Sequence, residues 1–392
     1  MGVPSGTTKV VQLGCGITGL VCAEELAKNP KVSEIVLADS RTEAAERLAS
    51  RLKNEKVSVK KVDGSDKKSV RSVLKGKDLV VCSLPYRLLR GAFETAADVG
   101  VNYLDFSLTV DKVEDIPWQM KKCKDAGITT ISAMGADPGI SDAMAVRAAS
   151  KLDEPKEAHV YDGDCGVAEG HEVFSLWSPV DMLEEATVPA AICRNGEFKF
   201  VPPLHEREEY DFPAPIGRLP VYKTLHEETF LMAKYIPGIT ETDFRIGIDD
   251  NFVSVAKAIR KLGMHSLTPV DYGGCKVVPL NFVSSFLPRT VDLPGKVKGH
   301  AGLVIEVIGK KNGKKMVSKV WGAMSHEYAY NRWKSNATGA LVGIGGALGA
   351  DILLSGHIKG PGLFVPEQLP VDKILEKLPS MGMEIKEEVK AL

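Results

Sequence analysis

The sequence predicts an α/β fold, in which a doubly wound parallel sheet is followed by an α+β domain. Two observations lead to this prediction. In residues 9–132, short apolar runs alternate with helical patterns, and most of these runs are apolar on both faces, as in parallel strands covered on both sides. Beyond Pro138, the runs alternate apolar with polar residues more often, as in strands that have one solvent face.

The first region opens with the apolar run Lys9–Leu13, which stops at a glycine and leads into a helical pattern over Ile17–Ala27. The strands predicted after it are Glu34–Ala38, Val57–Val62, Asp78–Cys82, Val101–Phe106 and Ile128–Ser132. The helices predicted between them are Thr42–Leu52, Lys67–Lys75, the segment from Pro85 to Ala97, and one that includes Met120–Asp125. This alternation predicts a parallel sheet built from strand–helix–strand units.

The second region has fewer and more amphipathic strands. They are predicted at Ala158–Asp162, Phe198–Phe200, Phe244–Gly247, Leu303–Gly309 and Lys315–Trp321. The last two are joined by the turn residues 309–313, which are typical of a hairpin. We expect an antiparallel sheet with helices, and after Pro361 one amphipathic helix (Val371–Leu378) and then a polar end.

Composition excludes several classes of protein. The 50 basic and 51 acidic residues nearly cancel, so nothing attracts the whole chain to nucleic acid. No histidine or cysteine spacing is typical of a metal site, and we predict no metal. The cysteines show no paired spacing, which indicates a reducing, cytoplasmic setting. They are Cys15, Cys22, Cys82, Cys123, Cys165, Cys193 and Cys275.

The most apolar stretch, Ala337–Leu354, is rich in glycine and interrupted by Asp351. It is short and small-sided for a membrane span, so we predict no membrane association. Its glycines also lack the lysine of a phosphate-binding P-loop. Small residues at helical spacing usually permit close helix packing, and we expect that role here.

A glycine motif, Gly14-Cys15-Gly16-Ile17-Thr18-Gly19, stands directly between the first predicted strand and its helix. In this context it predicts a Rossmann-type dinucleotide-binding turn. Gly14 would permit the tight turn, Gly16 the approach of a pyrophosphate, and Gly19 the close packing of helix on strand. The helix N-terminus would supply N–H groups and a positive dipole end to the phosphates.

Further cofactor contacts are expected where later strands end. Asp39 would accept hydrogen bonds from ribose hydroxyls and repel a 2′-phosphate, which favours NAD, but Ser40 and Arg41 follow it and an arginine there suits NADP. Asp63 is expected at the adenine edge or as a helix N-cap. The segment Ser83-Leu84-Pro85 ends its strand at the edge where ligands of such sheets bind.

The chain resembles the saccharopine dehydrogenase family, in the branch of saccharopine reductases, lysine 6-dehydrogenases and carboxynorspermidine dehydrogenases. Besides the glycine motif, the resemblance rests on short segments spread over most of the chain. They are Cys82–Tyr86, Tyr103–Asp105, Gly135–Gly139, Phe174–Pro179, Asp211–Pro213, Leu225–Glu228, Thr338-Gly339 and Gly362–Glu367. Gly135–Gly139 is the most distinctive of these, and Trp177-Ser178-Pro179 comes next.

The resemblance implies a Rossmann-type doubly wound parallel sheet completed by C-terminal residues, plus a central α+β substrate/dimerisation domain. We therefore expect a dinucleotide-binding domain over residues 1–135, a substrate domain over 136–350, and a segment 351–392 that returns to the first domain. It also implies a homodimer and hydride transfer with NAD or NADP at the C–N bond of a lysine-derived amino acid.

Saccharopine dehydrogenase activity is our leading expectation, with lysine 6-dehydrogenase and carboxynorspermidine dehydrogenase as alternatives. Saccharopine carries three carboxylates and would need several basic anchors, whereas a distal ammonium group would need an acid. A different class of function, a catalytically silent NAD(P)-sensing regulator, would keep the same glycine motif.

The resemblance also suggests site residues, each with a structural alternative. Tyr86, Asp105 and His226 are the catalytic candidates. Tyr86 is as well explained by packing at a domain junction, Asp105 by capping or backbone bonding, and His226 by a polar pair with Glu227. Asp137 and Pro138 are expected to shape the turn near the nicotinamide, and Asp142 to cap the helix that follows it.

The candidates for substrate binding lie mostly in the second region. They are Gly139, His171, Ser175, Trp177, Ser178 and Arg245, with Arg194 as a further carboxylate anchor. Core packing explains Trp177 as well, and lone arginines are usually surface residues. At His171 the family often has a tyrosine, and Asp39 precedes the Arg41-Thr42 pair that suits NADP; both departures bear on substrate and cofactor choice.

Overall fold

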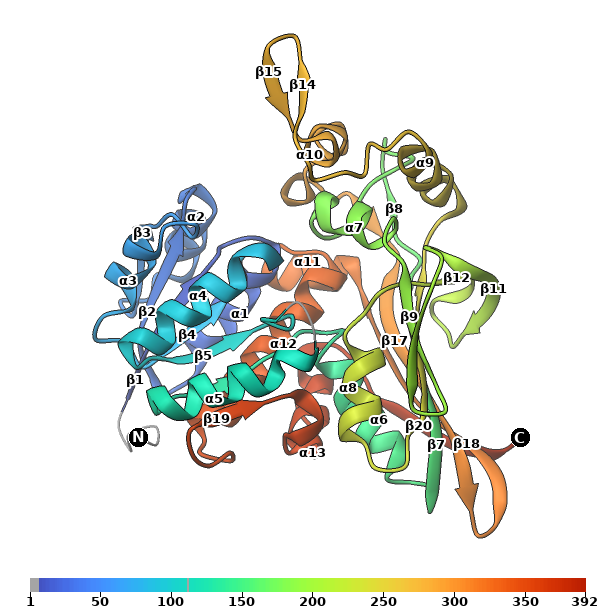
Figure 1. Ribbon diagram of the computed structural model, residues 1–392. Helices are drawn as coiled ribbons and strands as arrows, with labels where there is room; N and C mark the ends of the chain where they lie inside the picture. Colours follow the sequence, from blue (N-terminus) through green and yellow to red (C-terminus); the bar gives the residue numbers. More distant parts are fainter. Residues whose placement is uncertain (1–6, 111–112) are drawn as a thin grey trace. The chain divides into compact units, whose positions relative to one another are not determined.

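The structure, a computed structural model, describes residues 7–110 and 113–392. The chain divides into two compact units, Met1–Ala143 with Ala340–Met381, and Met144–Gly339 with Gly382–Leu392 (Figure 1). The divisions fall inside the helices α6 (Ile140–Ala149) and α12 (Ala337–Leu354), whereas the sequence placed them at residues 135 and 350.

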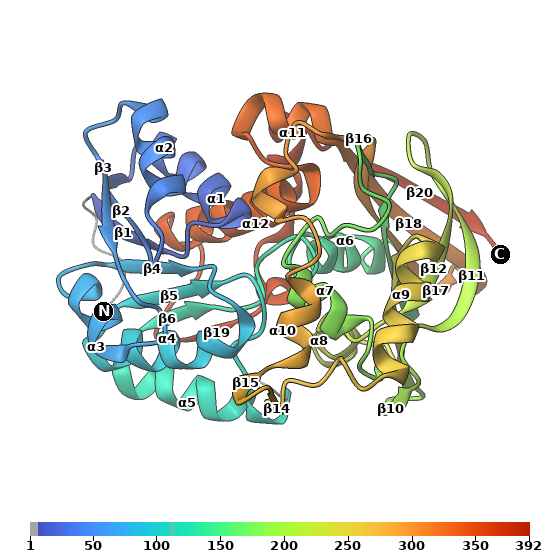
Figure 2. The same ribbon diagram turned by 90° about the horizontal axis from the view of Figure 1, so that it is seen from above.

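The first unit is built on a parallel sheet, as predicted. Its strands, within the described residues, have the order β19-β6-β5-β4-β1-β2-β3, so the chain winds outward from β1 in both directions. Figure 2 shows β4, β5, β6 and β19 side by side. The strands are β1 (Thr8–Leu13), β2 (Val32–Asp39), β3 (Val57–Lys61), β4 (Leu79–Cys82), β5 (Asn102–Asp105), β6 (Thr129–Ile131) and β19 (Gly362–Phe364).

Helices connect these strands close to their predicted positions. They are α1 (Ile17–Lys28), α2 (Glu43–Leu52), α3 (Lys67–Leu74), α4 (Tyr86–Val99), α5 (Ile116–Ala126) and α13 (Val371–Leu375). Helix α1 packs against α2, and α4 packs against α3 and α5, so that the sheet has two helical layers. The central strands are fully covered, and every residue of β4 is buried.

Helix α12 passes a length and hydropathy test for a membrane span, but 83% of that stretch is buried inside the protein. Its glycines explain how it packs. A side chain at Gly343 would come within 2.5 Å of the Thr18 carbonyl oxygen, and one at Gly349 would come equally close to Met134. The glycines therefore permit close helix packing, as expected, and a buried core helix meets the same test as a membrane span.

The C-terminal segment is shared between the units. Strand β19 pairs in parallel with β6 in the first unit, whereas β20 (Lys386–Ala391) pairs with β18 in the second. The end of the chain is polar, as predicted, but the sequence did not indicate that it forms a strand. β20 is an edge strand whose side chains are mostly exposed, so it carries no hydrophobic pattern to detect.

The second unit contains a large mixed sheet with the path β10-β9-β13-β7-β17-β18-β20, to which the hairpin β11–β12 is attached through β13. Its pairs are antiparallel except for β7 with β13, so the prediction of a wholly antiparallel sheet was wrong at that pair. The strands are β7 (Glu154–Asp164), β9 (Ala190–Arg194), β10 (Glu197–Val201), β11 (His205–Phe212), β12 (Gly217–Lys223), β13 (Glu241–Gly247), β17 (His300–Lys311) and β18 (Lys314–Ser325).

Helices and small strands complete the second unit. The helices are α7 (Pro179–Glu185), α8 (Glu228–Tyr235), α9 (Asp250–Lys261), α10 (Pro279–Ser284) and α11 (His326–Trp333). The small strands form the pairs β8 (Val167–Ala168) with β16 (Val297–Lys298), and β14 (Val270–Tyr272) with β15 (Cys275–Val277). The predicted hairpin β17–β18 is confirmed, with a two-residue turn in which Asn312 and Gly313 both have positive φ.

Candidate active site

The glycine turn of the first unit has the geometry of a phosphate cradle. Gly14 has a φ of +93°, and a Cβ there would lie 2.7 Å from the Ser83 carbonyl oxygen. A Cβ on Gly16 would meet nothing within 4 Å, so the backbone is open on that side. Helix α1 starts after Gly16 with no side-chain cap and no acidic residue in its first turn. An uncapped N-terminus beside an open turn fits a dinucleotide pyrophosphate.

Two side chains from neighbouring strands hold this turn. The Ser83 hydroxyl donates to the Gly14 carbonyl at 2.8 Å, and the Gln12 amide donates to Ser83 Oγ at 3.0 Å. Ser83 thus has a structural contact in addition to the cofactor contact expected for it, which stays a prediction. Leu84 lies against Gly64, and Pro85 is exposed at the N-terminus of α4.

Asp39 at the end of β2 lies beside the glycine turn. Its carboxylate accepts the Cys15 N–H at 2.7 Å and the Arg41 N–H at 2.9 Å, and the Ser40 hydroxyl is 3.4 Å away. This places an acidic group, half-exposed, where the ribose of a bound dinucleotide is expected. Burial raises the pKa of the Cys15 thiol to about 12, so Cys15 is inert there.

Two other candidates lie on the same edge of the sheet. Asp63 is exposed and forms a local turn with Ser65, which lowers its pKa, while the N-cap of α3 is Asp66. The alternative that Asp63 caps this helix was therefore wrong, and its adenine contact stays a prediction. Tyr86 is 42% exposed at the start of α4, and its hydroxyl donates to the Val110 carbonyl at 3.1 Å.

Asp105 does not lie at an open edge. It is fully buried, and its carboxylate accepts the Ser132 hydroxyl at 2.7 Å, the Ala133 N–H at 3.1 Å and a short bond from Thr109. Burial raises its pKa to about 7, opposed by those hydrogen bonds. Because both oxygens hold the loops after β5 and β6, the structure favours the backbone-bonding alternative over catalysis for this residue.

The segment Gly135–Gly139 closes on itself. The Gly135 N–H donates to the Pro138 carbonyl at 2.7 Å, and Gly139, with a φ of +131°, donates its N–H to Asp142 Oδ2 at 2.7 Å. Asp142 therefore caps the N-terminus of α6, as expected. The turn contains Asp137 and Pro138, whose contact with a cofactor stays a prediction, as does substrate binding by Gly139.

In the second unit, the segment with Trp177 is mainly structural. Trp177 packs on a small core of Ala168, Leu176, Leu293 and Val297. Ser175 is fully buried and bonds the Trp177 backbone, and Ser178 caps α7 through the Asp181 N–H. His171 is exposed. These contacts correspond to the core-packing alternative, and substrate binding by the four residues stays a prediction.

His226 lies in an acid-rich cluster, which we define as Asp162, Glu185, His226, Glu227 and Glu228. His226 Nδ1 is 2.6 Å from Glu228 Oε2 and 3.8 Å from Glu227 Oε2, so the expected pairing with Glu227 is mainly one with Glu228. The imidazole stacks on the Phe244 ring with 3.9 Å between centroids.

The charges of this cluster perturb one another. Burial raises the pKa of Asp162 to about 8, helped by the neighbouring charge of Asp164 and opposed by His226. Burial also raises the pKa of Glu185. Burial alone would lower the pKa of His226, but the charges of Glu228, Glu185 and Glu227 raise it well above its usual value. One imidazolium therefore faces an excess of carboxylates.

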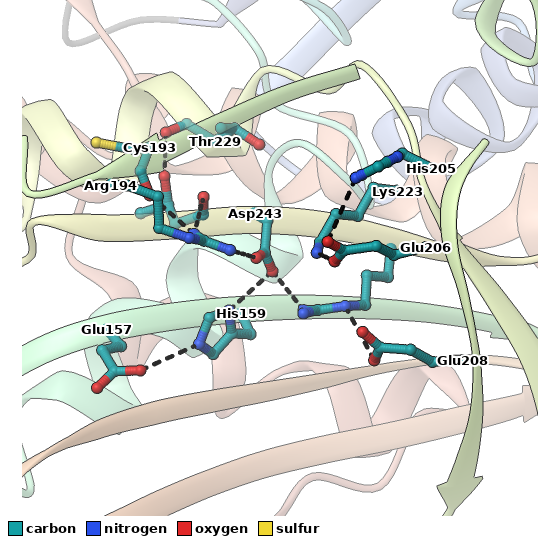
Figure 3. Close-up of polar contacts among 12 residues, drawn as sticks. Glu157, His159, Cys193, Arg194, His205, Glu206, Glu208, Lys223, Thr229 and Asp243 are labelled. Carbon is teal, nitrogen blue, oxygen red and sulfur yellow. Dashed lines mark hydrogen bonds and ion pairs between the residues drawn. The ribbon is translucent and has the colours of Figure 1, made fainter. Parts of the chain in front are cut away.

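A second polar cluster lies on the opposite face of the paired strands β7 and β13. We call it the Asp243 network (Figure 3). Asp243 is fully buried; its carboxylate bonds Arg194 at 2.7 Å and His159 at 2.8 Å, and it also pairs with Arg245. Figure 3 also shows Glu157, Glu208 and the Glu206–Lys223 pair around this centre.

The alternation of side chains separates the two clusters. Asp243 and Arg245 share one face of β13, and Phe244, on which His226 stacks, points to the other. His226, a catalytic candidate, and Arg245, a candidate for substrate binding, therefore belong to different clusters, and both roles stay predictions. Arg245 and Arg194 also have Asp243 as partner, so neither arginine is an open carboxylate anchor.

His226, Glu227 and Glu228 offer ligand atoms within 4.8 Å of one another, close enough for a metal ion. However, the short contact between His226 Nδ1 and Glu228 and the raised pKa of His226 favour an imidazolium, which cannot bind a metal. The expectation that the chain binds no metal stays a prediction.

Sequence reasoning missed Asp162, Glu185 and Glu228 as functional candidates. The adjacency of His226 with two glutamates was visible, as was an aspartate on each side of Gly163 at a strand end. Nothing in the sequence indicated that β7, α7 and the start of α8 bring these acids to one imidazole.

Comparisons with known proteins agree with this architecture. The family model described as saccharopine dehydrogenase NADP binding domain matches residues 10–131, and that described as saccharopine dehydrogenase C-terminal domain matches residues 135–383. A saccharopine dehydrogenase (L-Glu forming) from Saccharomyces cerevisiae has a similar fold, with a TM-score of 0.73, 17% identity, and coverage of 98% of this chain and 100% of that one.

The relatives that match over the whole length have other names. A carboxyaminopropylagmatine dehydrogenase of Synechocystis is 26% identical over 96% of both chains, and a carboxynorspermidine synthase of Vibrio cholerae is 29% identical over 95% of both. An α-aminoadipic semialdehyde synthase of Rattus norvegicus matches 48% of this chain and 21% of its own. With the glycine turn and both family models in place, the chain belongs to the saccharopine dehydrogenase family and is an NAD(P)-dependent oxidoreductase.

Proposed function

We propose that this enzyme forms the C–N bond of a carboxylated polyamine by reducing the imine between a cationic amine and an amino-acid aldehyde. The observation that carries the proposal is the acid-rich cluster of the second unit, where carboxylates outnumber the single imidazolium. A polyamine needs such acids, whereas saccharopine needs basic anchors, and Arg194 and Arg245 are already paired with Asp243.

The names of the full-length relatives support the same class. Carboxynorspermidine and carboxyaminopropylagmatine are both amines that carry a carboxylated aminopropyl group. If the C–N bond on the carboxylated side of the secondary nitrogen of carboxynorspermidine is oxidised to an imine and hydrolysed, the products are 1,3-diaminopropane and the four-carbon aldehyde of an amino acid, aspartate semialdehyde. We therefore prefer a carboxynorspermidine dehydrogenase-like activity, which we gave as an alternative, to saccharopine dehydrogenase activity.

The reaction balances as two steps. The primary amine attacks the aldehyde carbon, and loss of water leaves an imine. The imine carbon then gains a hydride and the nitrogen a proton, which gives the secondary amine. When bound, NADH or NADPH supplies the hydride.

The residues of the chain bind and orient the cofactor and the substrate. The open turn at Gly14–Gly19 and the N-terminus of α1 would hold the pyrophosphate, and Asp39 would hold the ribose. Tyr86, half-exposed at the sheet edge, remains our candidate for moving the proton at the reacting nitrogen. The acid-rich cluster attracts the amine.

A cofactor-oxidation assay tests this function. Aspartate semialdehyde is combined with 1,3-diaminopropane, putrescine, agmatine or lysine, each with NADH and NADPH, and saccharopine with NAD⁺ and NADP⁺ is run in parallel. We expect turnover with at least one diamine or agmatine and none with saccharopine. Turnover of saccharopine, with no amine above the blank, would contradict the proposal.

We further propose that the enzyme prefers NAD(H), because the Asp39 carboxylate lies beside the glycine turn, where it would repel a 2′-phosphate. Replacing Asp39 by Ala should weaken NADH binding about tenfold. It should also shift the preference toward NADPH, whose 2′-phosphate Arg41 could bind. The measurement is the ratio of kcat/KM for the two cofactors; an unchanged ratio would reject the assignment.

A further inference from the structure

The acid-rich cluster is incompletely satisfied. Among the residues that the structure describes, Glu185 Oε1 and Thr224 Oγ1 are buried oxygens without a hydrogen-bond partner. Thr224 is fully buried beside Glu185; the charge of His226 and, after it, the Thr224 hydroxyl oppose the rise that burial causes in the pKa of Glu185. Buried oxygens left without donors are costly, and a ligand that brings donors would remove that cost.

The missing partner is a cation. The charge of His226 opposes the rise in the pKa of both Asp162 and Glu185, but its Nδ1 is occupied by Glu228 at 2.6 Å, and within the described residues neither carboxyl group has a cation in ion-pair contact. A buried carboxylate needs a charge partner that also donates hydrogen bonds. An alkylammonium group supplies one positive charge and three donors.

The imidazole of His226 is held in place beside the carboxylates. The Phe244 ring, fully buried, lies under it with 10° between the planes, and Glu228 holds Nδ1 from the side. An imidazolium cannot bind a metal, so the acids beside it suit an ammonium group better than a bare metal ion.

We propose that Asp162, Glu185 and the His226–Glu228 pair form the subsite that holds the distal ammonium group of the amine substrate, the end that does not react. This assignment rests on the proposed function for the identity of the amine. In the subsite, Glu185 and Asp162 accept hydrogen bonds from the ammonium group, and Glu228 fixes the imidazole that closes it. The subsite thereby selects diamines over monoamines.

Calorimetric titration of the full-length protein with 1,3-diaminopropane, in the presence of NAD⁺, tests the subsite without requiring turnover. Propylamine, which lacks the distal ammonium, is titrated alongside. We expect Glu185→Gln to weaken binding of the diamine at least tenfold and to leave propylamine unchanged. Glu208→Gln, which removes a carboxylate beside Arg245 in the Asp243 network, is the matched control and should change neither.

Asp162→Asn is the second variant, and it keeps the test valid if Glu185→Gln fails to fold. Equal affinity of wild type and both folded variants for the diamine would overturn the subsite, as would a parallel loss for the diamine and propylamine. Failure of the proposed function looks different, since wild type would then bind the diamine through these acids but turn over no amine–aldehyde pair. No binding of the diamine to wild type would overturn the subsite outright.

Discussion

The two faces of the paired strands β7 and β13 carry opposite kinds of polar cluster. In the Asp243 network, each buried charge has a partner of the opposite sign, with Arg194, Arg245 and His159 around one carboxylate. In the acid-rich cluster, several carboxylates share one imidazole. The Asp243 network takes His159 from β7 and Asp243 and Arg245 from β13, whereas the acid-rich cluster takes Asp162 from the other face of β7 and adjoins β13 where His226 stacks on Phe244.

The difference separates a structural role from a binding role. Burial alone would raise the pKa of Asp243, but its contacts with His159, Arg245 and Arg194 hold that pKa well below its usual value. On the other face, the effect of burial on Asp162 is larger than the opposing effect of the His226 charge, and the pKa of Asp162 rises to about 8. A network whose buried charges are paired with charges of the opposite sign stabilises the fold, whereas a network short of cations is suited to a cationic ligand.

The largest expected effect is on the Asp243 network. Replacing Asp243 by Ala leaves the buried Arg245 and the partly buried Arg194 and His159 without their shared partner and should cost about 3–5 kcal/mol of the free energy of unfolding, measured by urea denaturation at pH 7. The half-exposed Glu208→Ala is the control and should cost less than about 1 kcal/mol. Equal losses would mean that the network is not the closed unit described here.

The same network predicts a pH window. The lowered pKa of Asp243 contributes stability above the unfolded-state pKa of about 4, which is lost as the pH falls toward its folded-state pKa. Acid unfolding curves should therefore lose this contribution below about pH 4 in wild type. An Asp243→Asn variant that retains the wild-type acid slope would contradict the assignment.

An intermediate effect is expected in the pH dependence of amine binding. Asp162, which is faced by Asp164, His226, Glu185 and Glu228, is protonated below about pH 8 and must lose its proton to hold a cation. The Kd for 1,3-diaminopropane should fall as the pH rises from 6 to 8, by up to about tenfold per pH unit. Asp162→Asn should flatten this dependence while Glu208→Gln keeps it, and an equal slope in both variants would argue against Asp162.

The smallest effect is on stability within the acid-rich cluster. Because burial raises the pKa of Glu185, the ionised carboxylate opposes folding at neutral pH, and Glu185→Gln should raise the free energy of unfolding slightly, by less than about 1 kcal/mol. Thermal unfolding at pH 8 measures it. A marked loss of stability would place Glu185 among the structural residues instead.

Most of the first unit could be predicted from the sequence, because buried parallel strands and the glycine turn leave strong local patterns. Strand β20 and the hairpin β11–β12 could not, since exposed and charged strands show no apolar alternation. The acid-rich cluster was also hidden, because Asp162, Glu185 and Glu228 meet only through strand pairing and helix packing. Arg245 appeared to be an anchor since the sequence does not show that Asp243, two residues earlier, binds it.

The central claim is that the acid-rich cluster holds an ammonium group, and a crystal structure of the enzyme with NAD⁺ and 1,3-diaminopropane tests it most directly. We predict an ammonium nitrogen at hydrogen-bond distance, about 2.8 Å, from Glu185 Oε1. A diamine bound elsewhere, with only water beside Glu185 and Asp162, would contradict the claim.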